Sequence, residues 1–348
     1  MNFCSDNVAG VTPEILAAIE TANRDAAARP YGNDAWTKRV EQHLTAIFER
    51  PVVAFPVISG TAANALSLSV MTPPYGVVYC HDEAHIAVDE CGAPEMYTGG
   101  AKLRPISGAD GKIPVDALAK VLANSCAGDV HRVQPAALSL TQATEAGTVY
   151  KPAEVAALCA LAKQHGLKTH MDGSRFANAV AHLNISPAEL TWKAGIDVLS
   201  FGASKNGALA AEAVVFFDEK LAETFGFRRK RAGHLISKMR FLSAQLDAYL
   251  TDGLWLKLAR HANSMAQRLV QGLTALPGVK LLYPVEANEI FIQLPVPTVA
   301  ALREAGFEFY DWPDSEPGTI RLVTAFNTQQ TAVDHFIDTA RRLSNVAA

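Results

Sequence analysis

Two short segments of the sequence hold the residue types of a covalent cofactor site. The apolar run from Leu167 to Asp172 has the length of a buried strand and ends in an acid, and the run 197–201 is followed by small residues and Lys205. We expect these neighbouring strand ends to bring together a carboxylate and an amine that lie 33 positions apart in the chain. Pyridoxal phosphate (PLP) suits such a pair, because its aldehyde requires a lysine and its ring nitrogen requires an acid.

The same two segments resemble the aspartate and lysine motifs of fold-type I PLP enzymes. In detail, they are most similar to the threonine aldolase and β-eliminating lyase family, including its low-specificity L-threonine aldolases, in the motifs HMDGSR (170–175) and SFGASKNG (200–207). The resemblance extends from Ser5 to Thr324 and covers nearly the whole chain. It implies PLP as cofactor and an α/β fold, in which a large domain with a mostly parallel sheet between helices is joined to a small α+β C-terminal domain.

The order of apolar runs agrees with that fold. Runs of strand length alternate with helical stretches in the first two thirds of the chain, at 77–80, 136–140, 167–172, 197–201 and 213–217. A helix is expected to begin at Thr12-Pro13 and to end near Pro30, and a long helical region is expected at 232–273. Shorter helical and strand-like segments follow it. We therefore expect a PLP-binding domain with an N-terminal arm at 1–240, and a small domain that includes the long linking helix at 241–348.

Composition excludes several classes of partner. The 348 residues are 49% hydrophobic and 19% charged, as in a globular enzyme, and the net charge of −4 gives no general attraction to nucleic acid. The basic run 228–231 is local and typical of a solvated or interface loop. We expect no membrane segment, since no apolar run approaches about 18 residues. No secretory signal is visible, and the five scattered cysteines indicate a reducing compartment, so a cytoplasmic location is expected.

Lys205 is the first candidate catalytic residue. A free lysine is mostly protonated at neutral pH, so burial and Schiff-base formation would make this one useful. An exposed loop lysine is the alternative, but the apolar strand and the partner acid favour the cofactor role. Asp172 would keep the ring nitrogen protonated, or alternatively cap the turn after its strand. Arg175 matches a family arginine near the cofactor's phenolic oxygen or the substrate carboxylate, and its alternative is an ion pair with Asp172.

A candidate phosphate cup precedes an apolar helical stretch. Gly60 would permit close approach of the backbone, and Ser59 and Thr61 would supply hydroxyls that donate hydrogen bonds. All three lie at the expected N-terminus of the helix, which attracts anions. A plain helix cap explains these three residues equally well by themselves, whereas the resemblance matches them to the family's cup. The resemblance also assigns Arg240 to the phosphate.

His85 follows the predicted strand 77–80. The resemblance matches it to a histidine that stacks on the pyridine ring near the substrate's β-hydroxyl, where an imidazole could hold or relay a proton. A capping or core histidine is the alternative. His81 and His85 also form an H-x-x-x-H pair, but the second position is Asp82 where a zinc protease needs glutamate, and no long helix carries the pair. We therefore expect no metal site.

Three further residues are candidate substrate ligands by resemblance. Arg321 matches the arginine that binds the substrate α-carboxylate, a contact worth about 1.5–3 kcal/mol. Ser5 matches a serine near the same carboxylate. Tyr31 corresponds to a loop that crosses into the neighbouring subunit's site, with an ordinary turn as the alternative. The resemblance thus implies a homo-oligomer, with a dimer as the active unit and a tetramer expected.

One departure from the family pattern concerns the second active-site histidine. The segment TQATEAG (141–147) lies where well-known threonine aldolases have ENTHNG, so that Glu145 replaces the histidine. Either Glu145 takes part in moving the hydroxyl proton, or the site relies on His85 and water. Because this position faces the β-substituent, the replacement leaves the substrate range open.

The implied reaction is reversible retro-aldol cleavage of L-threonine, L-allo-threonine and related L-β-hydroxy-α-amino acids such as phenylserine to glycine and an aldehyde. A PLP-dependent β-eliminating lyase or racemase built on the same residues is the first alternative. A PLP-fold binding protein without catalysis is a second, which the intact Lys205 and Asp172 disfavour, and a zinc hydrolase using His81 is disfavoured as above.

Overall fold

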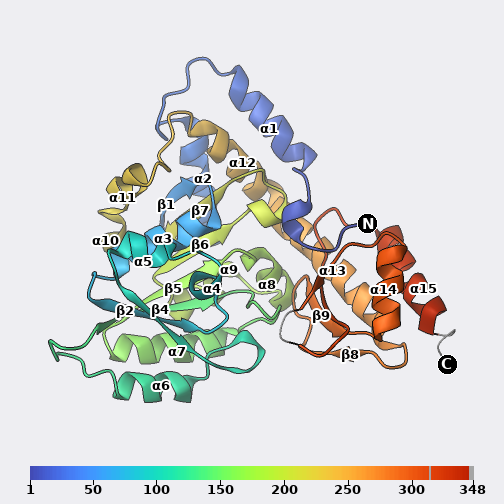
Figure 1. Cartoon of the computed structure of the whole chain (residues 1–348). Coiled ribbons are helices and arrows are strands. Elements are labelled where there is room, and N and C mark those ends of the chain that lie inside the picture. Colours follow the sequence, from blue (N-terminus) through green and yellow to red (C-terminus); the bar gives the residue numbers. More distant parts are fainter. Residues whose placement is uncertain (313–314, 345–348) are drawn as a thin grey trace.

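The computed structural model describes residues 1–312 and 315–344, and a seven-stranded sheet forms the centre of its larger part (Figure 1). In spatial order the strands are β1 (Val53–Val57), β7 (Glu212–Phe216), β6 (Val198–Gly202), β5 (Lys168–Gly173), β4 (Gln134–Thr141), β2 (Gly76–His81) and β3 (Lys102–Ile106). Strand β7 is antiparallel to both of its neighbours, and the pairs from β6 to β3 are parallel. The mostly parallel sheet and all five strands predicted from apolar runs are confirmed.

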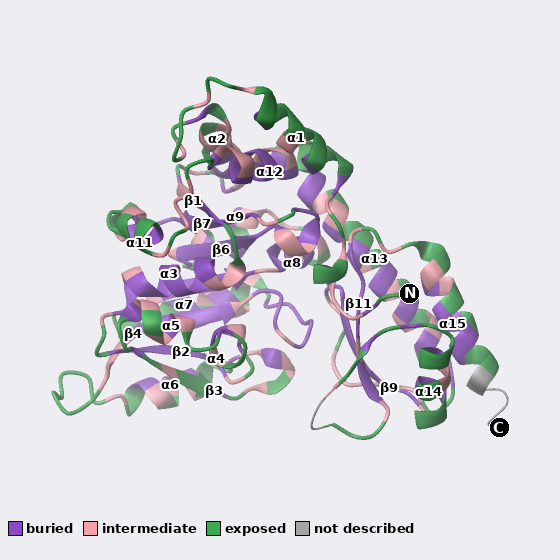
Figure 2. Ribbon diagram, turned by 45° about the horizontal axis from the view of Figure 1, so that its top comes forward, coloured by how far each residue is buried: buried purple, intermediate pink, exposed green. Residues whose placement is uncertain are grey.

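Both faces of this sheet are buried at its centre, which explains why most of its central strands are rich in apolar residues. In β2, Val77 and Tyr79 belong to the core on one face, whereas Val78 and Cys80 belong to the core on the other. Figure 2 shows the central strands and α3 as buried and the outer face of α1 as exposed. Helix α3 (Gly60–Met71) covers one face, and α7 (Pro152–Gln164) lies on the opposite face.

Further helices complete the larger part. They are α1 (Pro13–Arg24), α2 (Ala35–Ile47), α4 (His85–Val88), α5 (Ala93–Thr98), α6 (Val115–Ala123), α8 (Phe176–Leu183), α9 (Pro187–Leu190), α10 (Glu219–Ala222), α11 (Phe225–Arg231), α12 (Arg240–Leu250) and the start of α13 (Leu254–Thr274).

Two expected helices were wrong in their bounds, and turn residues explain the end of the first and the division of the second. Helix α1 begins at Pro13 as predicted, with Thr12 accepting a hydrogen bond from the Ile15 N–H, but it ends at Arg24. The Asp25 side chain there accepts a hydrogen bond from the backbone N–H of Ala27, a local turn that competes with the helix. The long helical region expected at 232–273 begins only at Arg240, and Asp252 and Gly253, which both adopt positive φ angles, divide it into α12 and α13.

The smaller part contains a four-stranded antiparallel sheet. Its strands, in spatial order, are β10 (Tyr310–Asp311), β11 (Thr319–Val323), β9 (Glu289–Gln293) and β8 (Lys280–Leu281), and α14 (Val296–Glu304) and α15 (Gln330–Ser344) accompany them. These elements confirm the small α+β domain. The second half of α13 packs on its core, through Met265 and Leu269, whereas the first half packs on the core of the large sheet through Trp255. The division at 240/241 stays a prediction, since α13 belongs to both cores.

The N-terminal residues cross from one part to the other. Phe3 is buried in the core of the small sheet, and its backbone N–H donates to the Glu308 carbonyl at 2.8 Å. A few residues later, Asp6 reaches the large part. Among the helices of the described residues, none combines the length and apolar character that a bilayer-spanning helix needs.

Candidate active site

The predicted carboxylate and amine lie at adjacent strand ends. Strand β5 delivers Asp172 to its carboxyl end, and β6 leads into the 3-10 turn Ser204–Asn206 that contains Lys205. Glycine at 202 makes this close approach feasible, because a Cβ atom there would lie 2.5 Å from the Ser174 carbonyl oxygen. The local sequence thus brings the end of β6 directly against the turn that follows Asp172.

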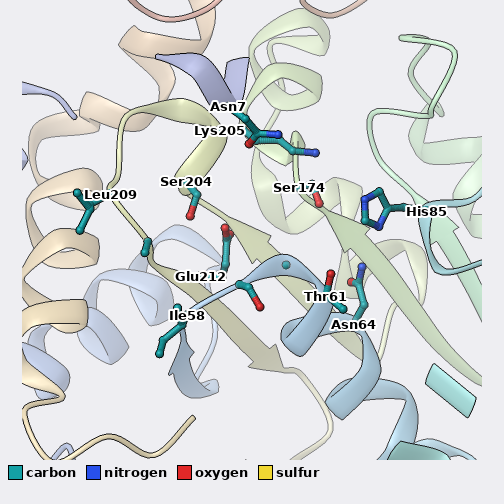
Figure 3. Close-up of a pocket in the computed structure, with 13 residues that line it drawn as sticks. Asn7, Ile58, Thr61, Asn64, His85, Ser174, Ser204, Lys205, Leu209 and Glu212 are labelled. Carbon is teal, nitrogen blue, oxygen red and sulfur yellow. The ribbon is translucent and has the colours of Figure 1, made fainter. Parts of the chain in front are cut away.

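Two adjoining cavities open at this edge of the sheet, of about 280 Å³ and 330 Å³. They share Asn7, His85 and Lys205 as lining residues. Figure 3 shows the first cavity, with Lys205 and Asn7 beside each other and the His85 ring facing the cavity from the opposite side. We call the first cavity, which reaches the start of α3, the inner cavity, and the second, which reaches Arg321, the outer cavity.

Asp172 lies behind the inner cavity, under two residues that line it. Its Oδ1 accepts hydrogen bonds from the backbone N–H and the hydroxyl of Ser174 at 3.0 and 2.7 Å, and its Oδ2 accepts one from Asn64 Nδ2 at 2.7 Å. Burial opposes ionisation, but these hydrogen bonds from Ser174 outweigh it and lower the pKa of Asp172 below its usual value. The carboxylate is therefore ionised. Its Oδ2 accepts one hydrogen bond among the described residues, which leaves a lone pair, and Asp172 itself is 2% exposed and lines neither cavity.

The start of α3 forms one wall of the inner cavity. Ser59 caps this 12-residue helix by accepting a hydrogen bond from the Ala62 N–H at 3.3 Å, and Gly60 and Thr61 line the cavity with it. Both the helix cap and the cavity wall are thus observed. Among the described residues that line this cavity, Lys205 is the single lysine or arginine.

His85 and Glu145 come together where the two cavities meet. The first N–H of α4, that of His85, donates to Glu145 Oε1 at 3.2 Å, and both side chains line the outer cavity. Burial, together with the nearby charges of Asp172 and Glu289, raises the pKa of Glu145 to about 7. A hydrogen bond to Glu90 raises the pKa of His85. Glu145 can therefore gain and lose a proton near neutral pH, and the raised pKa of His85 means that it holds its proton more tightly than a free imidazole.

A chain of alternating charges forms the wall of the outer cavity. Arg175 donates two hydrogen bonds to Asp6, at 2.8 and 2.9 Å, and forms an ion pair with Glu289 at 3.1 Å. Glu289 in turn pairs with Arg321, which also donates to the Cys4 carbonyl. The alternative in which Arg175 pairs with Asp172 is wrong, because Asp6 and Glu289 occupy the guanidinium.

The comparisons with known proteins agree with this geometry. The Beta-eliminating lyase family model matches residues 2–296. A low specificity L-threonine aldolase from Pseudomonas sp. (strain NCIMB 10558) is 46% identical over 331 residues, which are 95% of this chain and 94% of that protein.

The chain belongs to the beta-eliminating lyase family.

Two more distant proteins are also similar to this chain. The structure of a threonine aldolase from Leishmania major superposes with a TM-score of 0.92 at 28% identity and covers 99% of both chains. An alanine racemase from Cochliobolus carbonum is 29% identical and covers 84% of this chain and 75% of its own. Members of the family use PLP, and PLP is the cofactor of this chain.

The residues at the cavities fit PLP. An ionised Asp172 with a free acceptor position suits a protonated ring nitrogen, and the hydroxyls of Ser59 and Thr61 at the start of α3 suit a phosphate. Lys205 lines both cavities, so its amine lies where the cofactor's aldehyde and an amino-acid substrate would meet.

Arg240 and Tyr31 do not line either cavity of the same chain. The Arg240 Nε donates to the Ala22 carbonyl at 3.1 Å. Tyr31 is exposed in a loop with a positive φ of 58°, and the Lys230 amine lies 5.0 Å from the centre of its ring. Their predicted roles in the phosphate and substrate sites stay predictions that require a second subunit.

Sequence reasoning missed several polar residues that line the cavities or form hydrogen bonds with residues that line them. They are Asp6, Asn7, Asn64, Glu90, Glu212 and Glu289. Asp6 and Asn7 follow Ser5 in a segment that the family resemblance already included. Glu212, the first residue of β7, accepts a hydrogen bond from the Ala203 N–H at 2.9 Å, and burial raises its pKa to about 7. Asn64 lies in the segment 59–64 that begins with the candidate phosphate cup, whereas no local motif marks Glu90, Glu212 or Glu289.

Proposed function

We propose that this protein catalyses the reversible retro-aldol cleavage of L-threonine, L-allo-threonine and related L-β-hydroxy-α-amino acids, such as phenylserine, to glycine and an aldehyde. One observation carries the proposal: Lys205 lines both cavities. The inner cavity suits PLP, and the outer cavity is also lined by Arg321, His85 and Glu145. The 46% identical relative that is named a low specificity L-threonine aldolase supports the same reaction.

The inner cavity would hold the cofactor. Lys205 would bind it covalently, Asp172 would pair with its ring nitrogen, and Ser59, Gly60 and Thr61 would contact its phosphate. When bound, PLP withdraws electrons from the substrate Cα, so that a bond to Cα can break. Asp172 sustains this effect because its lowered pKa keeps it negative.

The outer cavity would orient the amino acid. Arg321 and Ser5 would hold the substrate carboxylate, and Arg321 is partly exposed to the cavity despite its ion pair with Glu289. Arg175 also lines the cavity, but its contacts with Asp6 and Glu289 already engage most of its donors. Arg175 would therefore hold Asp6 and Glu289 in place, and its remaining donors would contact the cofactor's phenolic oxygen or the substrate carboxylate. Fixing the carboxylate decides which Cα bond is placed for cleavage.

A base must remove the proton of the β-hydroxyl oxygen as the Cα–Cβ bond breaks. His85 and Glu145, which both line the outer cavity, are the two candidates for this base, and water is the third. Glu145, with a pKa of about 7, is ionised at mildly alkaline pH and can then accept the proton. The replacement of the family histidine by Glu145 thus preserves a group that titrates near neutrality.

We further propose a homo-oligomer whose dimer completes each site, with a tetramer as the full assembly. A doubly charged phosphate in the inner cavity would meet one lysine and no arginine among the described lining residues. Arg240 of a second subunit would supply the missing positive charge, and the exposed Tyr31 loop would reach the same site. A cytoplasmic location stays a prediction from the sequence.

Product analysis tests the reaction. Purified protein loaded with PLP is incubated with L-threonine, L-allo-threonine and phenylserine, and glycine and aldehyde are quantified. We expect equal amounts of both products from each substrate, and no reaction with L-alanine, which has no β-hydroxyl. Formation of ammonia and a 2-oxo acid would indicate a β-eliminating lyase, and D-alanine from L-alanine would indicate a racemase. Bound PLP with no product at all would indicate a non-catalytic binding protein.

A further inference from the structure

A buried chain of hydrogen bonds links His85 to Asp172 behind the cavity wall. His85 Nδ1 lies 2.9 Å from Glu90 Oε1, and the same oxygen accepts a hydrogen bond from Asn64 Nδ2 at 2.8 Å. Asn64 Nδ2 also donates to Asp172 Oδ2 at 2.7 Å. Asn64 comes from α3, Asp172 from β5, His85 from the start of α4 and Glu90 from the turn after α4, so the fold brings three separate segments together.

Among the described residues, the Glu90 side chain forms hydrogen bonds with Asn64 and His85 alone. It is 4% exposed, and its second oxygen, Oε2, is buried without a hydrogen-bond partner. Asn64 is 1% exposed, and its Oδ1 is likewise unpartnered. Burying a carboxyl group and an amide with unused acceptors is unfavourable. The contacts to His85 and Asp172 are thus the ones that hold these two side chains in place.

The contact with Glu90 sets the tautomer of His85 when Glu90 is ionised. Burial raises the pKa of Glu90, whereas its hydrogen bonds with His85 and Asn64 favour the ionised form. An ionised carboxylate oxygen can only accept, so the hydrogen between Glu90 Oε1 and His85 is then on Nδ1. That leaves Nε2 as the ring nitrogen that is free to bind or release a proton. The ring faces the cavity from the side opposite Lys205 in Figure 3.

We infer that Glu90 is a positioning residue, which holds His85 in the orientation and tautomer needed to exchange a proton at Nε2, and that Asn64 ties Glu90 to Asp172. The inference rests on the proposed function, because it concerns proton transfer by His85. One amide group donates to both carboxylates, so it separates two negative charges that would otherwise repel each other. The cofactor's acid and the proton-transfer histidine are thereby held in one rigid unit.

The charges around His85 agree with this role. Glu90 lies after its own helix α4, Asp172 ends β5, Glu145 approaches from the loop after β4, and Lys205 faces it across the cavity. The hydrogen bond to Glu90 makes the largest contribution to the raised pKa of His85, against the effect of burial. Removal of the Glu90 charge should therefore make the imidazole lose its proton at lower pH.

Acylation of histidines by diethyl pyrocarbonate measures this change without relying on activity. The reagent reacts with the neutral imidazole, and peptide mass spectrometry follows each histidine across a pH series. We expect the midpoint for His85 to move to lower pH in Glu90→Gln than in the unaltered protein, both with PLP bound and after its removal. His43 is an internal control, because it is as exposed as His85 and its own carboxylate partner, Asp247, is unchanged. An unshifted His85 midpoint would overturn the inference.

A double-mutant cycle separates positioning from general structural damage. We expect Glu90→Gln to lower kcat for L-threonine by about tenfold or more with little change in KM, and to cause no further loss when added to His85→Asn. A similar loss in both backgrounds would show that Glu90 acts independently of His85. Glu90→Asp, which keeps the charge but shortens the side chain, should be intermediate and replaces Glu90→Gln if that variant does not fold. Because the acylation midpoint needs no turnover, a protein that lacks aldolase activity would still test the role of Glu90.

Discussion

At the scale of single residues, the site is defined by how each charge is compensated. Asp172 is held ionised by hydrogen bonds, whereas Glu145 is buried near two other acids and titrates near pH 7. Lys205 and Asp172 were predictable because each ends an apolar strand in a recognisable motif. The contacts of Asp6 and Glu289 with Arg175 could not be predicted from spacing. Asp6 lies 169 residues before Arg175 in the chain, and Glu289 lies far after it.

Glu145 should control the rate on substrates with a β-hydroxyl. A base must be ionised to accept a proton, so its contribution to kcat should increase as the pH rises through about 7. Glu145→Gln should lower kcat for L-threonine at pH 8 by roughly 10²-fold and flatten the pH–rate profile near 7. Steady-state kinetics from pH 6 to pH 9 would check this, and unchanged rates would assign the proton to His85 or water.

The same substitution should change the dependence of stability on pH. The pKa of Glu145 is raised from 4.5 to about 7 in the folded protein, so the folded state holds its proton more tightly than the unfolded state. The free energy of unfolding should therefore fall as the pH rises from 4.5 to about 7, and this loss should be absent in Glu145→Gln. Urea unfolding at pH 5 and pH 8 measures the difference, and a variant that follows the unaltered protein at both values would contradict it.

At the scale of elements, strands buried on both faces were predictable and edge strands were not. The strands β2, β4, β6 and β7 are mostly apolar, and β5 is buried although it contains His170 and Asp172. By contrast, the edge strand β3 contains exposed Lys102 and Arg104, and the other edge strand, β1, contains Pro56. Proline and charged residues are typical of sheet edges and obscure the strand pattern. The antiparallel direction of β7 has no signal in its own sequence, because both directions bury the same apolar residues.

The end of β6 should tolerate no side chain at position 202. A Cβ atom in Gly202→Ala would lie 2.5 Å from the Ser174 carbonyl oxygen and would displace the residue whose hydrogen bonds hold Asp172. We expect a loss of about 1–3 kcal/mol in the free energy of unfolding and weaker PLP binding. Gly226→Ala is the matched control: it lies in α11 with no atom within 4 Å of the added carbon, so stability should stay the same or rise slightly. Equal behaviour of the two variants in thermal unfolding and PLP titration would refute the steric argument.

At the scale of the whole molecule, the site joins the two parts of the chain. The outer cavity combines Arg321 of the small sheet, Ser5 of the N-terminal segment and Lys205 of the large part. Sequence reasoning could place these residues in one site only through the family resemblance, because their spacing in the chain carries no periodic signal. The inner cavity remains short of positive charge within one chain, and this favours a site shared between subunits.

Subunit complementation tests the shared site. Lys205→Ala and Arg240→Ala should each be nearly inactive as homo-oligomers. Co-expression should restore about a quarter of the unaltered activity, because half of randomly formed dimers are mixed and each mixed dimer contains one intact site. No recovery, despite mixed oligomers in native mass spectrometry, would mean that Arg240 does not complete a partner's site.

The central claim is that Lys205 carries PLP at the junction of the two cavities, and borohydride reduction tests it most directly. Reduction of the purified protein makes the bond between cofactor and lysine permanent, and peptide mass spectrometry then locates the modified residue. We predict a single pyridoxyl modification on the peptide that contains Lys205, lost in Lys205→Ala and prevented when L-threonine displaces the lysine before reduction. A pyridoxyl group on another lysine, or an unmodified Lys205 in protein saturated with PLP, would contradict the account.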